Sequence, residues 1–553
     1  MLKIIPLGGL GEIGLNMMVF EYDETIIMVD AGLMFPEDYM LGVDIVIPDL
    51  TYVREKSSQI AAVFLTHSHE DHIGALPYLL KEVNPPVYGT PFTMGIVRNK
   101  LSEHDVAVHA NLNDLKAGEN ISIGPFNIEF IRVNHSTVDG VGLAIKTPEG
   151  LIIHTGDFKI NNTVIAGMMT DVNRFARHGE EGVLALLSDS TNVEKEGYTI
   201  SDMTVGDTLD RIIASSKGRV IIALFASNVA RIQQLVDIAI KRKRKIIFNG
   251  RSIELSVSVA KSLGFMDFPD DLIVDIRQLG LLSDKDVLII TTGSQGEPMS
   301  ALARMSSGVH KQIRIKEDDT VVLSSKFIPG NERAITNIIN SLYRKGANVI
   351  YDKISEIHVS GHAFQEELKL MISLTKPKYF MPVHGEYRHL IHHGRLAEQV
   401  GIPGENILIA ENGDIVVFDE NGGRIVESVQ TGRVLIDGKG VGDVGRSVLK
   451  ERRALSEDGI VVVTMILDEE TGTILYGPKL ESRGFVFWME TGHLVEDAQC
   501  VILEIVEEVM NNSEIGQHDR PDIIKNRLQK ALRQYFYFTI ERRPVILPQV
   551  IEV

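Results

Sequence analysis

The sequence contains a single cysteine, Cys500, among 553 residues. One cysteine excludes a disulfide framework and excludes a zinc site built from cysteine pairs, and it is typical of a reducing compartment. No signal peptide is visible, because the apolar start at residues 1–7 is short and is followed directly by glycines. We therefore expect a cytoplasmic protein.

Long hydrophobic runs are also missing, so we expect no membrane partner. The apolar stretch at residues 460–467 has the length of a strand, well below the roughly 20 residues of a membrane span. Positive charge is scarce, because 56 lysines and arginines face 75 aspartates and glutamates, which gives a net charge of −19. This balance disfavours non-specific nucleic-acid binding. A metal cluster or a local basic groove can still attract phosphate in an acidic protein, so nucleic acid is not excluded.

The remaining composition is that of an ordinary globular protein, with 44% hydrophobic and 24% charged residues. The chain is long enough for more than one domain. Between residues 201 and 351, segments with strand and helix patterns alternate, which predicts an α/β unit with a parallel sheet. After a glycine-rich stretch at residues 435–448, strand and helix patterns predict a last, small α/β module.

The densest group of candidate ligands is the segment THSHEDH at residues 66–72, directly after the apolar run 61–65. Such a run predicts a buried strand, and polar loops at strand ends often contain the functional residues of α/β proteins. His67 and His69 are two positions apart, so an extended backbone directs both rings to one side. Asp71 and His72 follow on the turn and can face a second ion. Imidazole and carboxylate are the ligands of zinc and manganese. The alternative is a polar loop that contains histidines by chance, and the density of the cluster disfavours it.

Further candidate ligands follow other predicted strands. A lone histidine after a strand is most often structural, so each position is weak evidence by itself. Their recurrence at strand ends is harder to attribute to loop composition. Asp30 also ends a predicted strand, and it could cap a loop or orient a metal-bound histidine. The candidate metal ligands are His67, His69, Asp71, His72, His135, Asp157 and His384. Seven ligands are sufficient for two ions that share a carboxylate.

A glycine motif, GxGxxG at residues 9–14, raises the alternative of dinucleotide binding. That interpretation requires a helix after the glycines. Residues 17–22 and 25–29 instead alternate in polarity and predict two strands. The glycines therefore predict a tight turn between strands.

Taken together, HxHxDH, a lone histidine and a Gly-Asp pair resemble the metallo-β-lactamase superfamily. The segments LSDSTN at 187–192, IHVSGHA at 357–363 and MPVHGE at 381–386 resemble its β-CASP branch, which processes nucleic acids. With GSQGEP at 293–298 and RRPVILP at 542–548, the order and spacing are similar to the bacterial ribonuclease J family over nearly the whole chain. Some members of that family lack ligands of HxHxDH, whereas this chain retains all of them, which favours an active enzyme.

The resemblance implies an α/β fold, namely an αββα metallo-β-lactamase sandwich with an inserted α/β β-CASP domain and a small C-terminal α/β domain. The expected boundaries are 1–202 and 352–420 for the two lactamase segments, 203–351 for the β-CASP domain, 421–445 for a linker, and 446–553 for the C-terminal domain. His384 lies after the insertion, so the metal site forms only when both lactamase segments fold together.

The resemblance also implies two divalent ions per chain, Zn²⁺ or Mn²⁺. His67, His69 and His135 would hold one ion; Asp71, His72 and His384 would hold the other; and Asp157 would bridge them. Two ions lower the pKa of a shared water and clamp the scissile phosphate. Asp71 is a candidate general base. His362 is a candidate to hold the phosphate and protonate the leaving 3′-oxygen, since imidazole donates near neutral pH. Asp189 and Asp30 are candidates to orient the ligands.

An RNA 5′-monophosphate pocket is a further implication of the resemblance. Short loops after predicted strands could bind the phosphate, although loop composition explains them equally well without the resemblance. His358 and His362 could instead be core histidines, which the family pattern disfavours more for His362. The candidate substrate-binding residues are Ser227, Asn228, Arg251, Ser252, His358, Ser360, Gly361 and His362. The basic run at residues 241–245 favours a solvated helix end over an RNA groove.

The expected activity is hydrolysis of RNA phosphodiester bonds, 5′→3′ exonucleolytic with endonuclease activity, in rRNA processing and mRNA decay. The expected partners are single-stranded RNA with a 5′-monophosphate, a second copy in a homodimer or homotetramer, and proteins of an RNA-degrading complex. A DNA nuclease and a non-catalytic subunit of such a complex stay as alternatives. A small-molecule hydrolase is disfavoured by the insertion, and a flavo-diiron enzyme by histidine at position 69.

Overall fold

The architecture was analysed in a computed structural model, which divides the chain into two compact units. The first unit comprises residues 1–35 and 45–434, and the second comprises residues 36–44 and 435–553. None of the helices built from the described residues combines the length and apolar character of a membrane span. The residues that the structure describes are 1–104, 106, 109–160, 169–294, 300–325, 331–352, 357–438, 440–442, 444–469, 471–486, 493–512 and 515–553.

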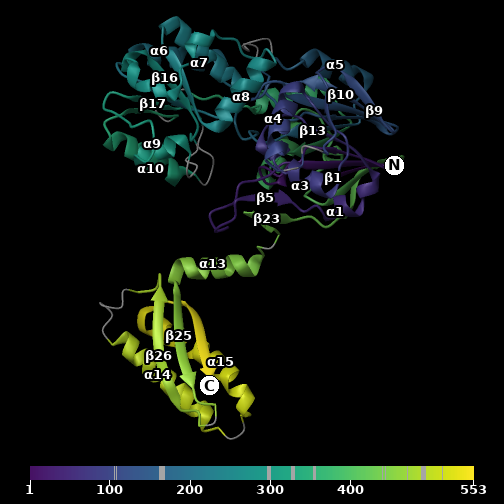
Figure 1. Cartoon of the computed structure of the whole chain (residues 1–553). Coiled ribbons are helices and arrows are strands. Elements are labelled where there is room, and N and C mark those ends of the chain that lie inside the picture. Colours follow the sequence, from purple (N-terminus) through teal and green to yellow (C-terminus); the bar gives the residue numbers. More distant parts are fainter. Residues whose placement is uncertain are drawn as a thin grey trace. The chain divides into compact units, whose positions relative to one another are not determined.

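Two sheets form the centre of the first unit (Figure 1). The eight-stranded sheet has the order β22 (Gly422–Ser428), β21 (Asp414–Asp419), β1 (Leu2–Gly8), β3 (Met17–Tyr22), β4 (Thr25–Val29), β6 (Ile60–Phe64), β7 (Val87–Gly89) and β8 (Leu112–Asp114). The six-stranded sheet has the order β19 (Tyr379–Val383), β13 (Ala185–Asp189), β12 (Gly150–His154), β11 (Val141–Thr147), β10 (Phe126–Arg132) and β9 (Asn120–Ile123).

The two sheets pack face to face through alternate side chains of their strands. One buried cluster joins Phe20 and Phe64 of the first sheet to Phe130, Leu143 and Ile152 of the second. Phe64 and Phe130 meet edge to face with ring centroids 6.2 Å apart. Because successive side chains of a strand point to opposite faces, the other residues of these strands need a second cover.

Helices supply that cover on both outer faces. Leu79 of α3 (Leu76–Glu82) and Val97 of α4 (Pro91–Glu103) pack on the outer face of the first sheet. Phe175 of α5 (Val172–Glu181) and Met371 of α11 (Gln365–Thr375) pack on the second, which α12 (Tyr387–Gln399) also covers. The predicted αββα sandwich is therefore confirmed.

The chain between β13 and α11 forms the predicted parallel α/β unit. Its sheet has the order β15 (Lys245–Asn249), β16 (Val287–Thr291), β14 (Val220–Ala223), β17 (Thr320–Leu323) and β18 (Asn348–Ile350), and every pair is parallel. One face packs on α6 (Asp202–Ser215), α7 (Val229–Arg242) and α8 (Arg251–Ser262), and the other on α9 (Ala301–Ser307) and α10 (Glu332–Arg344) (Figure 1). Central strands buried on both faces explain why their sequences are continuous apolar runs.

The basic run after α7 differs in part from its prediction. Lys241 and Arg242 pair with Asp210, which suits a surface helix end. The prediction of a solvated run is wrong for Arg244, which is buried. Its guanidinium donates to four backbone carbonyl groups, among them those of Gly218 and Val287. Arg244 therefore joins the ends of neighbouring elements.

The second unit contains a small α/β module. Its three-stranded sheet has β25 (Ile460–Leu467) between β26 (Ile474–Arg483) and β27 (Val545–Glu552). The inward residues of β25 pack on α14 (Leu494–Met510) and α15 (Arg520–Ile540). The sequence did not predict α13 (Arg446–Asp458) or β26, because α13 has no buried residue and β26 is mostly exposed.

The glycine motif forms turns, as predicted. Gly9, Gly11 and Gly14 all have positive φ angles, which glycine adopts at no steric cost. A short strand, β2 (Leu10–Gly11), pairs with β20 (Gly385–Glu386), and no helix follows before β3. The motif therefore brings the start of the chain next to the segment that contains His384.

One half-buried carboxylate in the loop before β11 predicts a pH-dependent change in stability. Burial raises the pKa of Asp139 to about 6 from its usual 3.8, although Phe92 N donates to its carboxylate at 3.2 Å. The folded state therefore binds this proton more tightly than the unfolded state, so the contribution of Asp139 to stability is most favourable below about pH 4 and is lost as pH rises through 6. Asp139→Asn should stabilise the protein by about 2 kcal/mol at pH 8 and lose that gain at acidic pH.

Thermal unfolding at pH 8 and pH 4.5 would check this prediction. Asn suits the site because it tolerates the positive φ of Asp139. Asp23→Asn is the matched control, since Asp23 also has a positive φ but is exposed. An equal shift at both pH values would contradict the assignment.

Candidate metal centre

The candidate ligands meet at one edge of the sandwich because their strands are aligned. β12, β13 and β19 run parallel in adjacent positions. Parallel strands end at the same edge of a sheet, so Asp189, the last residue of β13, lies together with Asp157 and His384 from the segments that follow β12 and β19. From the facing sheet, β6 leads into His67 and His69, and Asp71 and His72 lie in the one-turn helix α2 (Glu70–Ile73).

The first cluster brings together three imidazoles. His69 Nδ1 lies 3.0 Å from His67 Nε2 and 3.1 Å from His135 Nε2. Asp157 Oδ2 is 3.6 Å from His67 Nε2 and 3.7 Å from His135 Nε2. Burial lowers the pKa of all three histidines, to about 4 for His69, so the rings are neutral, which is the metal-binding form.

The outer nitrogens of these rings fix their tautomers. His135 Nδ1 donates to the carbonyl of Gly361 at 2.8 Å, and His67 Nδ1 lies 3.0 Å from Thr66 Oγ1. Because the Thr66 hydroxyl donates to Asp30, it accepts from His67. In a neutral ring the other nitrogen then has a lone pair, so lone pairs converge at the centre of the cluster. A cation satisfies such an arrangement, and the residues therefore fit a metal ion.

The second cluster contains carboxylates as well as imidazoles. Asp71 Oδ2 lies 3.6 Å from His72 Nε2 and 3.5 Å from His384 Nε2, and Asp157 Oδ2 lies 3.2 Å from His72 Nε2. His384 Nε2 is buried and has no hydrogen-bond partner among the described residues. An unpaired buried ring nitrogen that faces a carboxylate also fits a metal ion.

The electrostatics of the second cluster also fit a bound metal ion. Burial by itself lowers the pKa of His72 and His384, but Asp157 and its neighbouring carboxylates outweigh burial and raise both, to about 10 for His384. Burial also raises the pKa of Asp71 and Asp157, and the facing histidines outweigh it and hold both below their usual values. Ionised carboxylates in a buried site require positive charge, which protons or divalent ions can supply.

His362 lies beside both clusters. Its Nδ1 is 2.8 Å from Asp189 Oδ2 and 3.9 Å from Asp157 Oδ2. Burial lowers the pKa of His362, and the two carboxylates outweigh it and raise the pKa. Asp157, Asp189, His362 and His384 form a third group whose ligand atoms lie within 4.8 Å of one another. His362 can therefore act as a charged donor or as a further ligand.

Two residues expected to orient the ligands lie where such a role requires. His72 Nδ1 donates to Asp30 Oδ2 at 2.7 Å, and Asp30 also accepts from the backbone N–H and hydroxyl of Thr66. Asp189 Oδ1 accepts from Thr191, which leaves Oδ2 directed at His362. Both carboxylates are buried and fully hydrogen-bonded.

The eight candidate substrate-binding residues do not form one group. Ser227 Oγ lies 2.9 Å from His69 Nε2, and Asn228 caps α7 by accepting from Arg231 N. Arg251 and Ser252 are exposed at the start of α8, and no contact given by the described residues joins them to the clusters.

The loop around Ser360 is packed closely against the metal site. Asn192 Nδ2 donates to Ser360 Oγ and to the carbonyl of His362, and His358 is half-buried. A side chain at Gly361 would lie 2.6 Å from the His135 ring, so only glycine permits this approach. Of the motif at 293–298, residues 295–298 lie outside the described residues.

Sequence reasoning missed several residues that support the site. Asn16 Nδ2 donates to the carbonyl of Asp71 at 3.1 Å, and it follows the glycine motif that was interpreted only as a turn. Glu367 is fully buried and accepts from the backbone N–H groups of Ile160, Thr199 and Phe364. Glu367 thereby joins the loop after Asp157 to the loop after His362. In the sequence, the only sign of this supporting role is that Glu367 lies five residues after His362.

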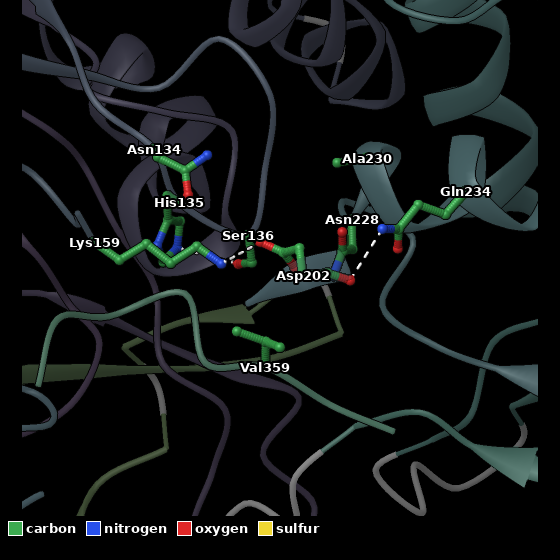
Figure 2. A pocket seen from close by; sticks show the side chains of 9 residues that line it. All are labelled: Asn134, His135, Ser136, Lys159, Asp202, Asn228, Ala230, Gln234 and Val359. Carbon is green, nitrogen blue, oxygen red and sulfur yellow. Dashed lines mark hydrogen bonds and ion pairs between the residues drawn. The ribbon is translucent and has the colours of Figure 1, made fainter. Parts of the chain in front are cut away.

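A small cavity of about 20 Å³ borders the first cluster (Figure 2). His135, Lys159, Asp202 and Asn228 are among the residues that line it. A volume of this size holds about one water molecule and not a nucleotide. It is therefore a packing feature between the metal site and the inserted unit.

Four family models match most of the chain, in the order that this architecture requires. Residues 10–168 match the metallo-beta-lactamase superfamily, and residues 217–342 match the ribonuclease J beta-CASP domain. Residues 347–409 match the Zn-dependent metallo-hydrolase RNA specificity domain, and residues 447–553 match the ribonuclease J C-terminal domain. Fold and site define a metal-dependent hydrolase of the metallo-β-lactamase superfamily.

Similar proteins cover the chain from end to end. Ribonuclease J 1 of Streptococcus pyogenes is 42% identical over 99% of this chain and 97% of its own length. Ribonuclease J2 of Bacillus subtilis is 42% identical over 100% of this chain and 98% of its own length, and ribonuclease J of Synechocystis is 43% identical over 100% and 86%. The chain belongs to the ribonuclease J family.

A solved structure supports the fold independently. A protein of unknown function from Enterococcus faecalis aligns with a TM-score of 0.53 at 17% identity, over 75% of this chain and 99% of that one. At this level of identity the likeness concerns the fold alone.

Proposed function

We propose that the protein is a metal-dependent ribonuclease that hydrolyses RNA phosphodiester bonds with two divalent ions. The observation that carries this proposal is the pair of ligand clusters that share Asp157, in a chain that belongs to the ribonuclease J family. His67, His69 and His135 would hold the first ion, and Asp71, His72 and His384 the second. Zn²⁺ and Mn²⁺ both suit this set of nitrogen and oxygen ligands.

When bound, the two ions would supply Lewis-acid chemistry to the scissile phosphate and to the attacking water. Asp71 is the proposed general base. Its side chain is 31% exposed, whereas that of Asp157 is only 2% exposed, so Asp71 is the carboxylate that a water molecule can reach. The histidines beside Asp71 lower its pKa and hold it in the ionised, proton-accepting form.

His362 is proposed to contact the phosphate and to donate a proton to the leaving 3′-oxygen. The carboxylates of Asp189 and Asp157 outweigh burial and raise the pKa of His362, which favours the protonated ring near neutral pH. Asp189 orients the ring through Nδ1, so Nε2 is the atom that can donate to the substrate.

The direction of attack and the cellular context are parts of the same proposal. We assign 5′→3′ exonuclease activity with internal cleavage of longer RNA, a binding site for a 5′-monophosphate, and a role in rRNA processing and mRNA decay in the cytoplasm. The substrate-binding residues are Ser227, Asn228, Arg251, Ser252, His358, Ser360, Gly361 and His362. We also propose that the protein forms homodimers or homotetramers and that it has partners in an RNA-degrading complex. The proposed domain boundaries are 1–202, 203–351, 352–420, 421–445 and 446–553.

The proposal is tested with single-stranded RNA labelled internally, with either a monophosphate or a triphosphate at its 5′ end. Cleavage is measured with Mn²⁺ and with EDTA, beside a DNA of the same sequence. We expect metal-dependent release of mononucleotides from the monophosphate RNA, with the DNA spared.

Each other outcome has a definite meaning. Equal cleavage of DNA would replace the proposal with a broader β-CASP nuclease. Absence of cleavage with any divalent ion would favour a non-catalytic subunit. Equal rates for both 5′ ends would remove the monophosphate site and leave the metal-dependent cleavage in place.

A further inference from the structure

The inserted α/β unit makes a direct contact with a ligand of the proposed metal site. Ser227 lies in the turn between β14 and α7, and its Oγ is 2.9 Å from His69 Nε2. His69 Nδ1 faces the ring nitrogens of His67 and His135 and is thus the ligand atom. The proton of the neutral ring is therefore on Nε2, which donates to the Ser227 hydroxyl.

The turn that contains Ser227 is held rigidly. Its backbone closes through hydrogen bonds from Asn228 N to Phe225 O and from Val229 N to Ser227 O. The Asn228 side chain then caps α7 by accepting from Arg231 N at 3.1 Å. The position of Ser227 is therefore set by the first turn of α7.

An ion-pair network fixes α7 against the segments that contain the metal ligands, and Figure 2 shows its Lys159–Asp202 pair. Arg231 of α7 is 3% exposed and donates to Asp202 Oδ1 at 3.0 Å, while Lys159 is 2% exposed and donates to Asp202 Oδ2 at 2.7 Å. Lys159 is two residues after Asp157, and its backbone N–H donates to Asn134, the neighbour of His135. Asp202 thus joins α7 to two ligand-bearing segments.

Resting on the proposed metal site, we infer that Ser227 is a positioning residue through which the inserted unit orients His69 and sets the affinity of the first ion. A hydrogen bond to the outer nitrogen of a ligating histidine fixes the ring and its tautomer, and removal of such a bond typically weakens metal affinity 10- to 100-fold. The other four outer-nitrogen bonds of the two clusters, made by Thr66, Gly361, Asp30 and Asp157, all come from the lactamase segments. Among the described contacts, the bond between His69 and Ser227 is the one outer-nitrogen hydrogen bond whose partner lies in the inserted unit.

The same hydroxyl can serve an RNA phosphate as well. A serine hydroxyl accepts through its lone pairs and has one hydrogen to donate. Ser227 accepts from His69, so its hydrogen is available to an anion. Metal binding and phosphate binding would then strengthen each other through one atom, and by linkage the coupling is reciprocal.

The test measures binding of Mn²⁺ alone to the metal-free full-length protein by isothermal titration calorimetry. Ser227→Ala should weaken the affinity of one of the two ions by roughly tenfold or more. Ser227→Thr retains a hydroxyl and should bind within about threefold of the parent. Ser262→Ala is the control, since Ser262 is an exposed serine at the end of α8 in the same unit and its hydroxyl donates only to Val259 O among the described contacts, and it should leave both affinities unchanged.

The outcomes separate this inference from the proposed function. Equal Mn²⁺ affinities for the parent protein and Ser227→Ala would overturn the inference and leave the metal site in place. Failure of the parent protein to bind Mn²⁺ would overturn both. A loss in Ser262→Ala equal to that in Ser227→Ala would also overturn the inference, because it would show an effect of the unit as a whole.

Discussion

Asp157→Ala should lower the rate of RNA cleavage by at least about 10³-fold. The reason is that Asp157 belongs to every candidate ligand group, with one oxygen near His67, His72 and His135 and the other 2.8 Å from His384 Nδ1. Without it, neither cluster retains its shared carboxylate. The rate is measured on monophosphate RNA with saturating Mn²⁺, and metal content is measured by elemental analysis.

Asp71→Ala provides the comparison that tests whether the two clusters share Asp157. Asp71 belongs to one cluster only, so this variant should also lose cleavage but retain about one ion, whereas Asp157→Ala should retain less than one. Both variants should unfold at temperatures close to that of the metal-free parent. Cleavage by Asp157→Ala within tenfold of the parent rate would remove the two-ion mechanism.

His362→Ala should lower turnover by about 10²- to 10³-fold while metal content stays near that of the parent. His362 is 20% exposed, and Asp189 holds its ring at 2.8 Å, so the ring is both accessible and oriented. A group that holds the phosphate and donates a proton affects turnover more than metal binding. The measurement compares single-turnover rates and metal content of the same preparations.

Two further variants make this result specific. Asp189→Asn retains the imidazole but weakens its orientation, and it should lose activity by a smaller factor than His362→Ala. His392→Ala, at an exposed histidine of α12, is the matched control and should retain the parent rate. Parallel loss of metal and turnover in His362→Ala would reassign His362 as a metal ligand, which its place in the third group allows.

The fold could be predicted from the sequence where local patterns and tertiary packing agree. The strands β3 and β4 have the predicted limits, because their residues alternate in polarity and a turn separates them. Prediction was poorer in the second unit. There, α13 packs few apolar residues and β26 alternates only weakly, so periodicity gives little signal.

For the candidate site, the residue types could be predicted from the sequence, but the individual contacts of each residue could not. Ligands at strand ends could be predicted because parallel strands end at one edge. The contact of Ser227 with His69 spans 158 positions, and no local pattern encodes it. Gly361 was expected to contact phosphate, yet its carbonyl accepts from His135. Such contacts depend on how the insertion packs, which the chain order alone does not specify.

The order of the ligands along the chain also sets when the enzyme can become active during synthesis. His384 contacts Asp157 across 227 positions, so the second cluster is incomplete until the whole insertion has been translated. At a bacterial elongation rate of roughly 5–20 residues per second, that interval is on the order of 10–45 s. A nascent chain therefore lacks the complete second cluster until His384 has been translated, and any chemistry that needs both clusters can start only after that point.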